Sequence, residues 1–187
     1  MQYDLSLGAV SDAPHRHRLF FAVLPDAATA MLVRRLAWEL KRRFGLAGAP
    51  LKPEHLHMTV EFFGAFPELT DGIVETAKWL GAGVVAAPFD VTLKEAISFR
   101  NDARRPLVLQ GRHGGFDVLQ RAIWRVLGPD FRGRKATPHM TLLYDDQMVK
   151  RTGLAEPISF AARELVLVHS IYGESRHEHL AKWPLRG

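Results

Sequence analysis

The stretch Leu56-His57-Met58-Thr59-Val60 is the starting point for the fold, because its pattern returns as Pro138-His139-Met140-Thr141-Leu142. In an extended strand, side chains two positions apart point to the same face, so each copy places an imidazole beside a hydroxyl. The apolar residues between and after them then point into a core. Because the second histidine follows the first by 82 residues in a chain of 187, the repeat predicts two halves that each deliver one histidine and one threonine to a shared cleft.

Length and composition indicate an ordinary globular protein. The 187 residues are 47% hydrophobic and 24% charged, which is enough for one core or two small fused lobes. No apolar run approaches the roughly 20 residues that cross a bilayer. Residues 1–14 lack the basic start and apolar block of a secretory signal. Cysteine is absent, which excludes disulfides, thiolate chemistry and cysteine zinc sites and fits a cytoplasmic protein.

Hydrophobic periodicity predicts strands where apolar runs have strand length, and helices where apolar residues recur every three or four positions. The predicted strands cover residues 19–24, 56–64, 89–99, 107–109, 138–144, 160–170 and 179–183, and the predicted helices cover residues 27–44, 68–80 and 116–127. This order predicts an α+β fold with two pseudo-symmetric lobes, in which mainly antiparallel sheets are flanked by helices around a central cleft. We expect residues 1–18 to be a flexible leader, residues 19–187 to be a single bilobal domain, and residues 153–157 to form a loop.

Basic residues are the candidates for contacts with an anionic substrate, which the formal net charge of +5 favours. Arg132, Arg134 and Lys135 stand directly before the second motif. The predicted helix over residues 27–44 has an apolar stripe and an opposite basic face, which we interpret either as a solubilising surface or as a track for phosphates. The candidates for stacking on a terminal base are Phe62, Phe63, Phe99 and Tyr144.

Histidine spacing raises the alternative of a metal site. His55 and His57 have the His-x-His spacing of a metal-binding pair. A third ligand at a comparable spacing is not evident in the sequence, and Thr137 stands in the second copy where His55 stands in the first. The sequence therefore predicts no metal and no other cofactor. We interpret three further histidines, which lack a threonine partner, as structural or surface residues: His169, His177 and His179.

Two imidazoles and two hydroxyls suit a displacement at phosphorus. Because an imidazole has an unperturbed pKa of ~6.5, one ring can begin neutral as a base while its partner begins charged as an acid. The base takes a proton from the entering oxygen, and the acid gives one to the leaving oxygen. Threonine hydroxyls can donate hydrogen bonds to the non-bridging oxygens, and nearby cations can balance their charge. A cyclic phosphodiester fits this apparatus because its leaving oxygen stays tethered and its ring is strained.

The paired motifs resemble those of a known superfamily. His57-Met58-Thr59-Val60 and His139-Met140-Thr141-Leu142 are similar to the His-x-Thr-hydrophobic motifs of the 2H phosphoesterases. More narrowly, residues 53–59 and 137–142 resemble the bacterial and archaeal RNA 2′,3′-cyclic phosphodiesterases, often named 2′-5′ RNA ligases. The resemblance runs from Leu19 to the terminal region. It implies a bilobal α+β fold and metal-independent hydrolysis of RNA 2′,3′-cyclic phosphate ends to 2′-phosphomonoesters.

The resemblance also implies roles for the motif residues. His57 would be the proton donor to the departing 3′ oxygen, His139 the base that activates water, and Thr59 and Thr141 the residues that hold the phosphate. The two histidine roles can be exchanged, because the spacing is symmetric and the same pair can run 2′-5′ ligation in reverse. The implied partner is RNA with a cyclic phosphate end, with no obligate protein partner.

Three alternatives stay open. The substrate of the same motifs can instead be a small cyclic nucleotide, an ADP-ribose cyclic phosphate or a 2′-5′ linked oligonucleotide. The histidines can belong to a metallohydrolase, or the chain can be a non-catalytic RNA-binding module that uses its arginine-rich surface. The longer leader before Leu19 departs from the family, and we attach no function to it.

Overall fold

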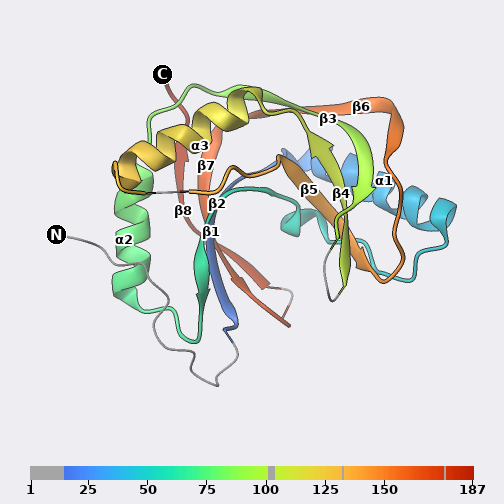
Figure 1. Ribbon diagram of the computed structural model, residues 1–187, viewed down its shortest axis with the longest axis horizontal. Coiled ribbons are helices and arrows are strands. Elements are labelled where there is room, and N and C mark those ends of the chain that lie inside the picture. The colour runs from blue at the N-terminus through green and yellow to red at the C-terminus, as the bar shows by residue number, and fades with distance from the viewer. Residues whose placement is uncertain (1–14, 101–103, 132, 175) are drawn as a thin grey trace.

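The computed structural model describes residues 15–100, 104–131, 133–174 and 176–187. Within these residues the chain forms two four-stranded antiparallel sheets and three α-helices (Figure 1). The strands are β1 (His17–Val23), β2 (Met58–Phe66), β3 (Phe89–Ser98), β4 (Arg105–Gly111), β5 (His139–Asp145), β6 (Thr152–Ala162), β7 (Glu164–Ile171) and β8 (Arg176–Pro184). The helices are α1 (Ala27–Phe44), α2 (Asp71–Ala82) and α3 (Gly114–Leu127), with a short 3₁₀ turn, η1 (Pro53–His55).

The two sheets repeat one arrangement. Their strand orders are β2-β1-β7-β8 and β5-β4-β3-β6, so the strands that carry the two motifs, β2 and β5, each lie at one edge. In the first sheet β1 leads through α1 to its antiparallel neighbour β2, and in the second β4 leads through α3 to its antiparallel neighbour β5. The predicted α+β fold with two pseudo-symmetric lobes of antiparallel sheet is therefore confirmed.

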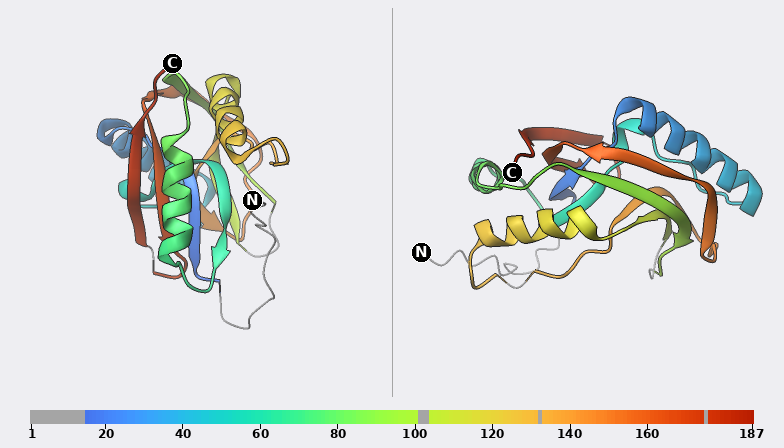
Figure 2. Two further views of the ribbon diagram at one scale, coloured as in Figure 1. Left: turned by 90° about the vertical axis from the view of Figure 1, so that its left-hand side faces the viewer. Right: turned by 90° about the horizontal axis from the view of Figure 1, so that it is seen from above.

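The helices join the two lobes. α1 packs against β5 and β6 of the second sheet, whereas α3 contacts β2 of the first sheet and β3 of the second. Seen from above, α1 and α3 lie on opposite sides of the strands (Figure 2). One continuous cluster of buried side chains includes residues of both sheets, among them Phe21, Met58, Leu109 and Met140. The two lobes are therefore packed on a common core.

The predicted helix over residues 27–44 is confirmed residue for residue because both of its ends are marked. The Asp26 side chain accepts hydrogen bonds from the backbone amide and the hydroxyl of Thr29, at 2.9 and 2.8 Å, and so caps the first turn. Gly45 ends the helix with φ of 64°, a left-handed conformation that favours glycine. Among the described residues, none of the helices has both the length and the apolarity that a bilayer crossing needs.

The prediction of a single strand over residues 160–170 is wrong. The segment contains the end of β6 and most of β7, which belong to different sheets and are separated at Arg163. The predicted loop at residues 153–157 is wrong too, because it lies inside β6. Among the described residues this strand is an edge strand that pairs with β3, and its buried side chains are confined to its second half, at Ile158, Phe160 and Ala162. Its first half therefore lacks the alternation that reveals a strand.

Most other elements are confirmed with shifted boundaries, among them the first strand and the first motif strand. β1 begins at His17, so part of the predicted leader belongs to the first strand, while residues 1–14 lie outside the described residues. The first motif strand begins at Met58 instead of Leu56, because Pro53–His55 form a 3₁₀ turn whose Leu56 amide donates to the Pro53 carbonyl.

Candidate active site

The two motif histidines are held in the same way. Nδ1 of His57 lies 2.7 Å from the carbonyl oxygen of His55, and Nδ1 of His139 lies 2.7 Å from the carbonyl oxygen of Thr137. A carbonyl only accepts hydrogen bonds, so each ring donates through Nδ1–H. Each neutral ring therefore carries its proton on Nδ1, and its Nε2 keeps a lone pair for a second partner.

The hydroxyls of the two motif threonines, like Nε2 of the two histidines, are free to bind a second partner. Thr59 pairs with Ala22 on β1, and Thr141 pairs with Val108 on β4. Both side chains are half-buried, and neither hydroxyl makes a hydrogen bond with the part of the chain that the structure describes. The alternation predicted from the sequence is confirmed, because Met58 and Met140 between the polar residues are 1% and 0% exposed.

Gly111 marks the point at which the two motifs meet. Its amide donates to the carbonyl of Pro138 at 2.8 Å, immediately before the second motif. A Cβ atom at Gly111 would lie 3.5 Å from Cε of Met58 and 3.6 Å from Cβ of Pro138. The two motifs, far apart in the sequence, are therefore close neighbours in the fold.

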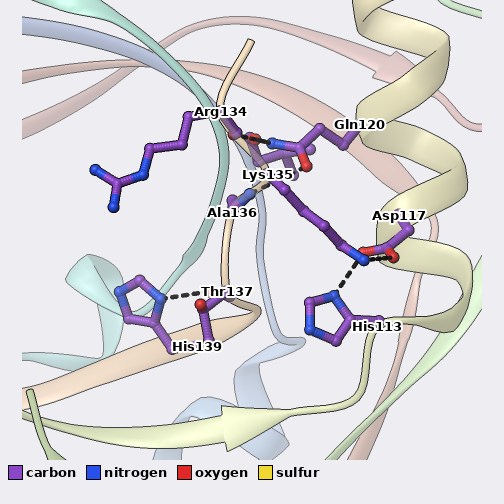
Figure 3. Close-up of polar contacts among 9 residues, drawn as sticks. His113, Asp117, Gln120, Arg134, Lys135, Ala136, Thr137 and His139 are labelled. Atoms are coloured by element: carbon purple, nitrogen blue, oxygen red, sulfur yellow. Dashed lines mark hydrogen bonds and ion pairs between the residues drawn. The ribbon is translucent and has the colours of Figure 1, made fainter.

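Gln120 of α3 ties the two motif strands together. Its side chain is 2% exposed. Its Nε2 donates to the carbonyl of Val60 on β2 at 2.9 Å and to that of Arg134 at 3.4 Å. Its Oε1 accepts from the amide of Ala136 at 3.2 Å, just before β5 (Figure 3). One buried amide thus fixes the first motif strand against the segment that leads into the second.

The His57 ring is surrounded by other rings. It stacks on Phe20 with 4.9 Å between centroids, and His177 of β8 meets it edge-on at 5.3 Å. His177 also lies 4.5 Å from the ring of His55. Burial lowers the pKa of His57 from its ordinary 6.5 to about 4, and the charges of His139 and His55 lower it further. Burial likewise lowers the pKa of His177, to about 3.

The His139 ring has fewer aromatic neighbours. Phe99, at the end of β3, lies 4.9 Å from it between centroids. Burial lowers the pKa of His139, and the hydrogen bond to the Thr137 carbonyl acts in the opposite direction. His57 and His139 are therefore both neutral at pH 7 in the free protein. A positive charge on His139 lowers the pKa of His57 further.

Comparisons with known proteins bear on the fold. No family model matches the chain, and no curated protein matches it. Among solved structures, TT0787 of Thermus thermophilus is similar with a TM-score of 0.71 and 21% identity, over 91% of this chain and 98% of that one. A phosphoesterase is similar with a TM-score of 0.69 and 23% identity, over 92% of this chain and 99% of that one. LigT of E. coli is similar with a TM-score of 0.69 and 24% identity, over 92% of this chain and 99% of that one.

The chain has the 2H phosphoesterase fold. The resemblance read from the two motifs is thus confirmed for the fold. E. coli LigT has also been solved in complexes with 3′-AMP, NADP⁺, phosphate and ATP. Among the described residues of the present chain, no group of three or more His, Cys, Asp or Glu side chains is arranged to hold a metal ion.

The four other side chains that the sequence predicts to contact the substrate have different positions in the fold. Arg134 extends to the side of the loop on which the His139 ring lies (Figure 3). Lys135 turns the other way, and its Nζ lies 2.8 Å from the Asp117 carboxylate. Tyr144 is 40% exposed on β5. Arg132 lies outside the described residues. The contacts of all four with a substrate stay predictions.

Sequence reasoning missed two residues of this site. His177 was interpreted as structural or surface, because pairing across strands that are distant in the sequence decides what β8 lies beside. Gln120 had a usable signal, since it occupies a position on the apolar stripe of α3 between Phe116 and Ile123. A polar side chain on a buried stripe indicates a buried hydrogen bond.

Proposed function

We propose that this protein is an RNA 2′,3′-cyclic phosphodiesterase, which hydrolyses cyclic phosphate termini to 2′-phosphomonoesters without a metal. The observation that carries the proposal is the identical tethering of His57 and His139. Both rings donate through Nδ1 to a carbonyl and keep Nε2 for a reacting oxygen. Two imidazoles prepared in this way, one directly before β2 and one at the start of β5, match the needs of general acid-base catalysis. The phosphoesterase and LigT structures with the same fold support the reaction class.

The proposed reaction uses the two rings in opposite protonation states. His139 takes a proton from water as the oxygen attacks phosphorus, and His57 gives a proton to the departing 3′ oxygen. A negatively charged phosphodiester between the rings favours protonation of one of them. Burial lowers the pKa of His57 below that of an exposed histidine. Its imidazolium, once formed, therefore gives up its proton more readily. The roles can be exchanged, since both rings have the same tether.

The remaining polar groups stabilise the phosphate. The hydroxyls of Thr59 and Thr141, which lack other partners among the described residues, donate to the non-bridging oxygens as negative charge develops there. Arg134 supplies a positive charge from the loop before β5. The same pair of histidines can act on a 5′ hydroxyl in place of water. One ring takes the proton of that hydroxyl as its oxygen attacks the cyclic phosphate, and the other gives a proton to the departing 3′ oxygen, which leaves a 2′-5′ linkage. The proposal therefore includes 2′-5′ ligation, whose reverse restores the cyclic end and the 5′ hydroxyl. It also includes a cytoplasmic location and a single domain over residues 19–187.

A second candidate keeps the machinery and changes the substrate. The complexes of E. coli LigT with 3′-AMP, ATP and NADP⁺ contain free nucleotides instead of an RNA strand. They favour phosphodiesterase activity on a small cyclic nucleotide as the alternative. Competition between such a nucleotide and an RNA with a cyclic end distinguishes the two substrates.

The test is product identification from a defined oligonucleotide with a 2′,3′-cyclic end, in the presence of a chelator. We expect the wild-type protein to release only the 2′-phosphate, and His57→Ala and His139→Ala each to lower kcat by about 10²- to 10⁴-fold. His113→Ala is the matched control, because this histidine is tethered to Asp117 of α3 and not to a motif carbonyl. Activity that chelation abolishes and zinc or manganese restores would favour a metallohydrolase. RNA binding without turnover, unchanged in both variants, would make the chain a binding module.

A further inference from the structure

Helix α1 carries most of the net positive charge of the chain. It has five basic residues and one acidic residue, Glu39, which give a net charge of +4 against +5 for all 187 residues. The basic residues are Arg34, Arg35, Lys41, Arg42 and Arg43. Such a concentration in a single element creates a local positive potential that attracts a polyanion.

Three of these cations, Arg34, Arg42 and Arg43, have no charged or hydrogen-bonding partner among the described residues. Lys41 donates to the carbonyls of Ala47 and Gly48, at 2.7 and 2.8 Å, and Arg35 pairs with Glu39 at 3.3 Å. Arg34 and Arg42 make no ion pair or side-chain hydrogen bond with the residues that the structure describes. Their guanidinium groups therefore have donors free for an external anion.

Exposed apolar side chains accompany the free cations. Met31 is 58% exposed and Trp38 is 43% exposed, although large apolar side chains are usually buried. They line a surface hollow of about 440 Å³ on the outer side of α1. The residues of this α1 stripe are Met31, Arg34, Arg35, Trp38, Glu39 and Arg42. The buried side of the helix, with Val33, Ala37 and Leu40, already packs on the core.

Helix α1 lies next to the candidate active site through η1. α1 packs against η1, and His55 of η1 lies 4.5 Å from His177, which in turn contacts His57. α1 also follows directly from β1, whose Ala22 pairs with Thr59. The helix therefore starts beside the site, and the stripe runs away from it toward Arg42.

We propose that the α1 stripe binds the body of a single-stranded RNA whose cyclic phosphate end lies at the two motif histidines. Bases stack on Trp38, and Arg34 and Arg42 contact phosphates, which is the combination that binds single strands without sequence preference. The inference rests on the proposed function. A single strand is favoured over a duplex because only unpaired bases offer faces for stacking. It is favoured over an anionic membrane because the broad apolar face of α1 is used in the core.

Binding is measured first, by fluorescence anisotropy of a labelled oligonucleotide of about 16 nucleotides with a cyclic phosphate end. We expect Trp38→Ala to weaken binding at least about fivefold. We expect Arg34→Gln combined with Arg42→Gln to reduce the slope of log K against log salt by about 1.4, because each phosphate contact on a single strand contributes about 0.7. The matched controls are Trp79→Ala, which removes a 68% exposed tryptophan from α2, and Arg121→Gln with Arg125→Gln on the exposed face of α3.

Turnover is measured second, as kcat/KM for the same oligonucleotide and for a dinucleotide with the same cyclic end. We expect Trp38→Ala to lower kcat/KM for the long RNA and to leave that for the dinucleotide unchanged. A wild-type protein that turns over neither substrate contradicts the proposed function, and the binding measurement still decides the inference.

Several results would overturn the role of the α1 stripe. One is an affinity of the stripe variants for the long RNA equal to that of the wild type. Another is an equal loss of affinity in the control variants. Duplex RNA that binds as tightly as the single strand would contradict stacking on Trp38. Stripe-dependent binding to phosphatidylserine vesicles, without RNA binding, would assign the surface to a membrane instead.

Discussion

Replacing Gln120 by methionine tests whether one buried amide holds the two motifs together. Methionine has a similar length but neither donates nor accepts as an amide does. The change removes the bond to Val60 at 2.9 Å, the bond from Ala136 at 3.2 Å and the longer bond to Arg134 at 3.4 Å. Each lost hydrogen bond costs about 1 kcal/mol, and a buried backbone group left without a partner raises the cost to about 1–3 kcal/mol. We expect a total loss of about 2–4 kcal/mol in the free energy of unfolding.

The assay is urea unfolding followed by tryptophan fluorescence, combined with kcat/KM at 25 °C. A protein of ordinary stability stays almost fully folded after such a loss, so a fall in kcat/KM of tenfold or more reports displacement of the motifs instead of unfolding. The matched control is Gln110→Met, because Oε1 of Gln110 is buried without a hydrogen-bond partner among the described residues. A Gln120→Met protein with the stability and activity of the wild type would refute the role of this residue as a clamp.

Three further predictions concern the histidines. Because burial lowers the pKa of both His57 and His139, and turnover needs one of them protonated, kcat/KM should rise as the pH falls from about 8 to about 6.5. A kcat/KM profile that peaks above pH 7 would contradict this. The neutral folded form of His57 stabilises the protein above pH 6.5, and this contribution is lost as the pH falls toward 4. His57→Gln should therefore lose about 2 kcal/mol less stability between pH 7.5 and 5 than the wild type, in urea titrations. The control Thr59→Ser should lose as much stability over this pH range as the wild type. An equal loss in His57→Gln would contradict the lowered pKa of His57. Finally, His177→Phe should keep the edge-on packing against His57 and most of kcat, whereas His177→Ala should lower kcat about tenfold with little change in KM. Equal kcat in the two variants would show that this ring does not position His57.

The sequence predicted best where local chemistry alone decides the structure. The bounds of α1 follow from the cap at Asp26, the left-handed Gly45 and an apolar stripe between them, all of which lie within 20 consecutive residues. The motif strands were recognisable because one side of each is buried, so Met58 and Met140 alternate with polar residues. These features depend on neighbours in the chain, and a single sequence contains them in full.

The prediction failed where distant pairing decides the structure. β6 is a strand because β3 supplies its hydrogen-bond partners, and its exposed first half carries no pattern of its own. His177 is part of the site because β8 reaches η1 and the His57 ring across the first sheet. The number of histidines was known from the sequence, but which of them meet depends on strand order, and periodicity does not encode strand order.

The internal repeat gives the two histidines equal tethers and unequal surroundings, and the proposed chemistry needs both properties. Equal hydrogen bonds from Nδ1 fix the same tautomer in both rings, so each can exchange a proton through Nε2. Unequal neighbours surround the two rings, since His57 lies among Phe20, His55 and His177, whereas His139 contacts Phe99. Acid and base roles are assigned in a catalytic pair by environments that push two pKa values apart. A pseudo-symmetric fold can therefore support a directional proton transfer, provided that the asymmetry lies in the side chains that pack around the two motifs.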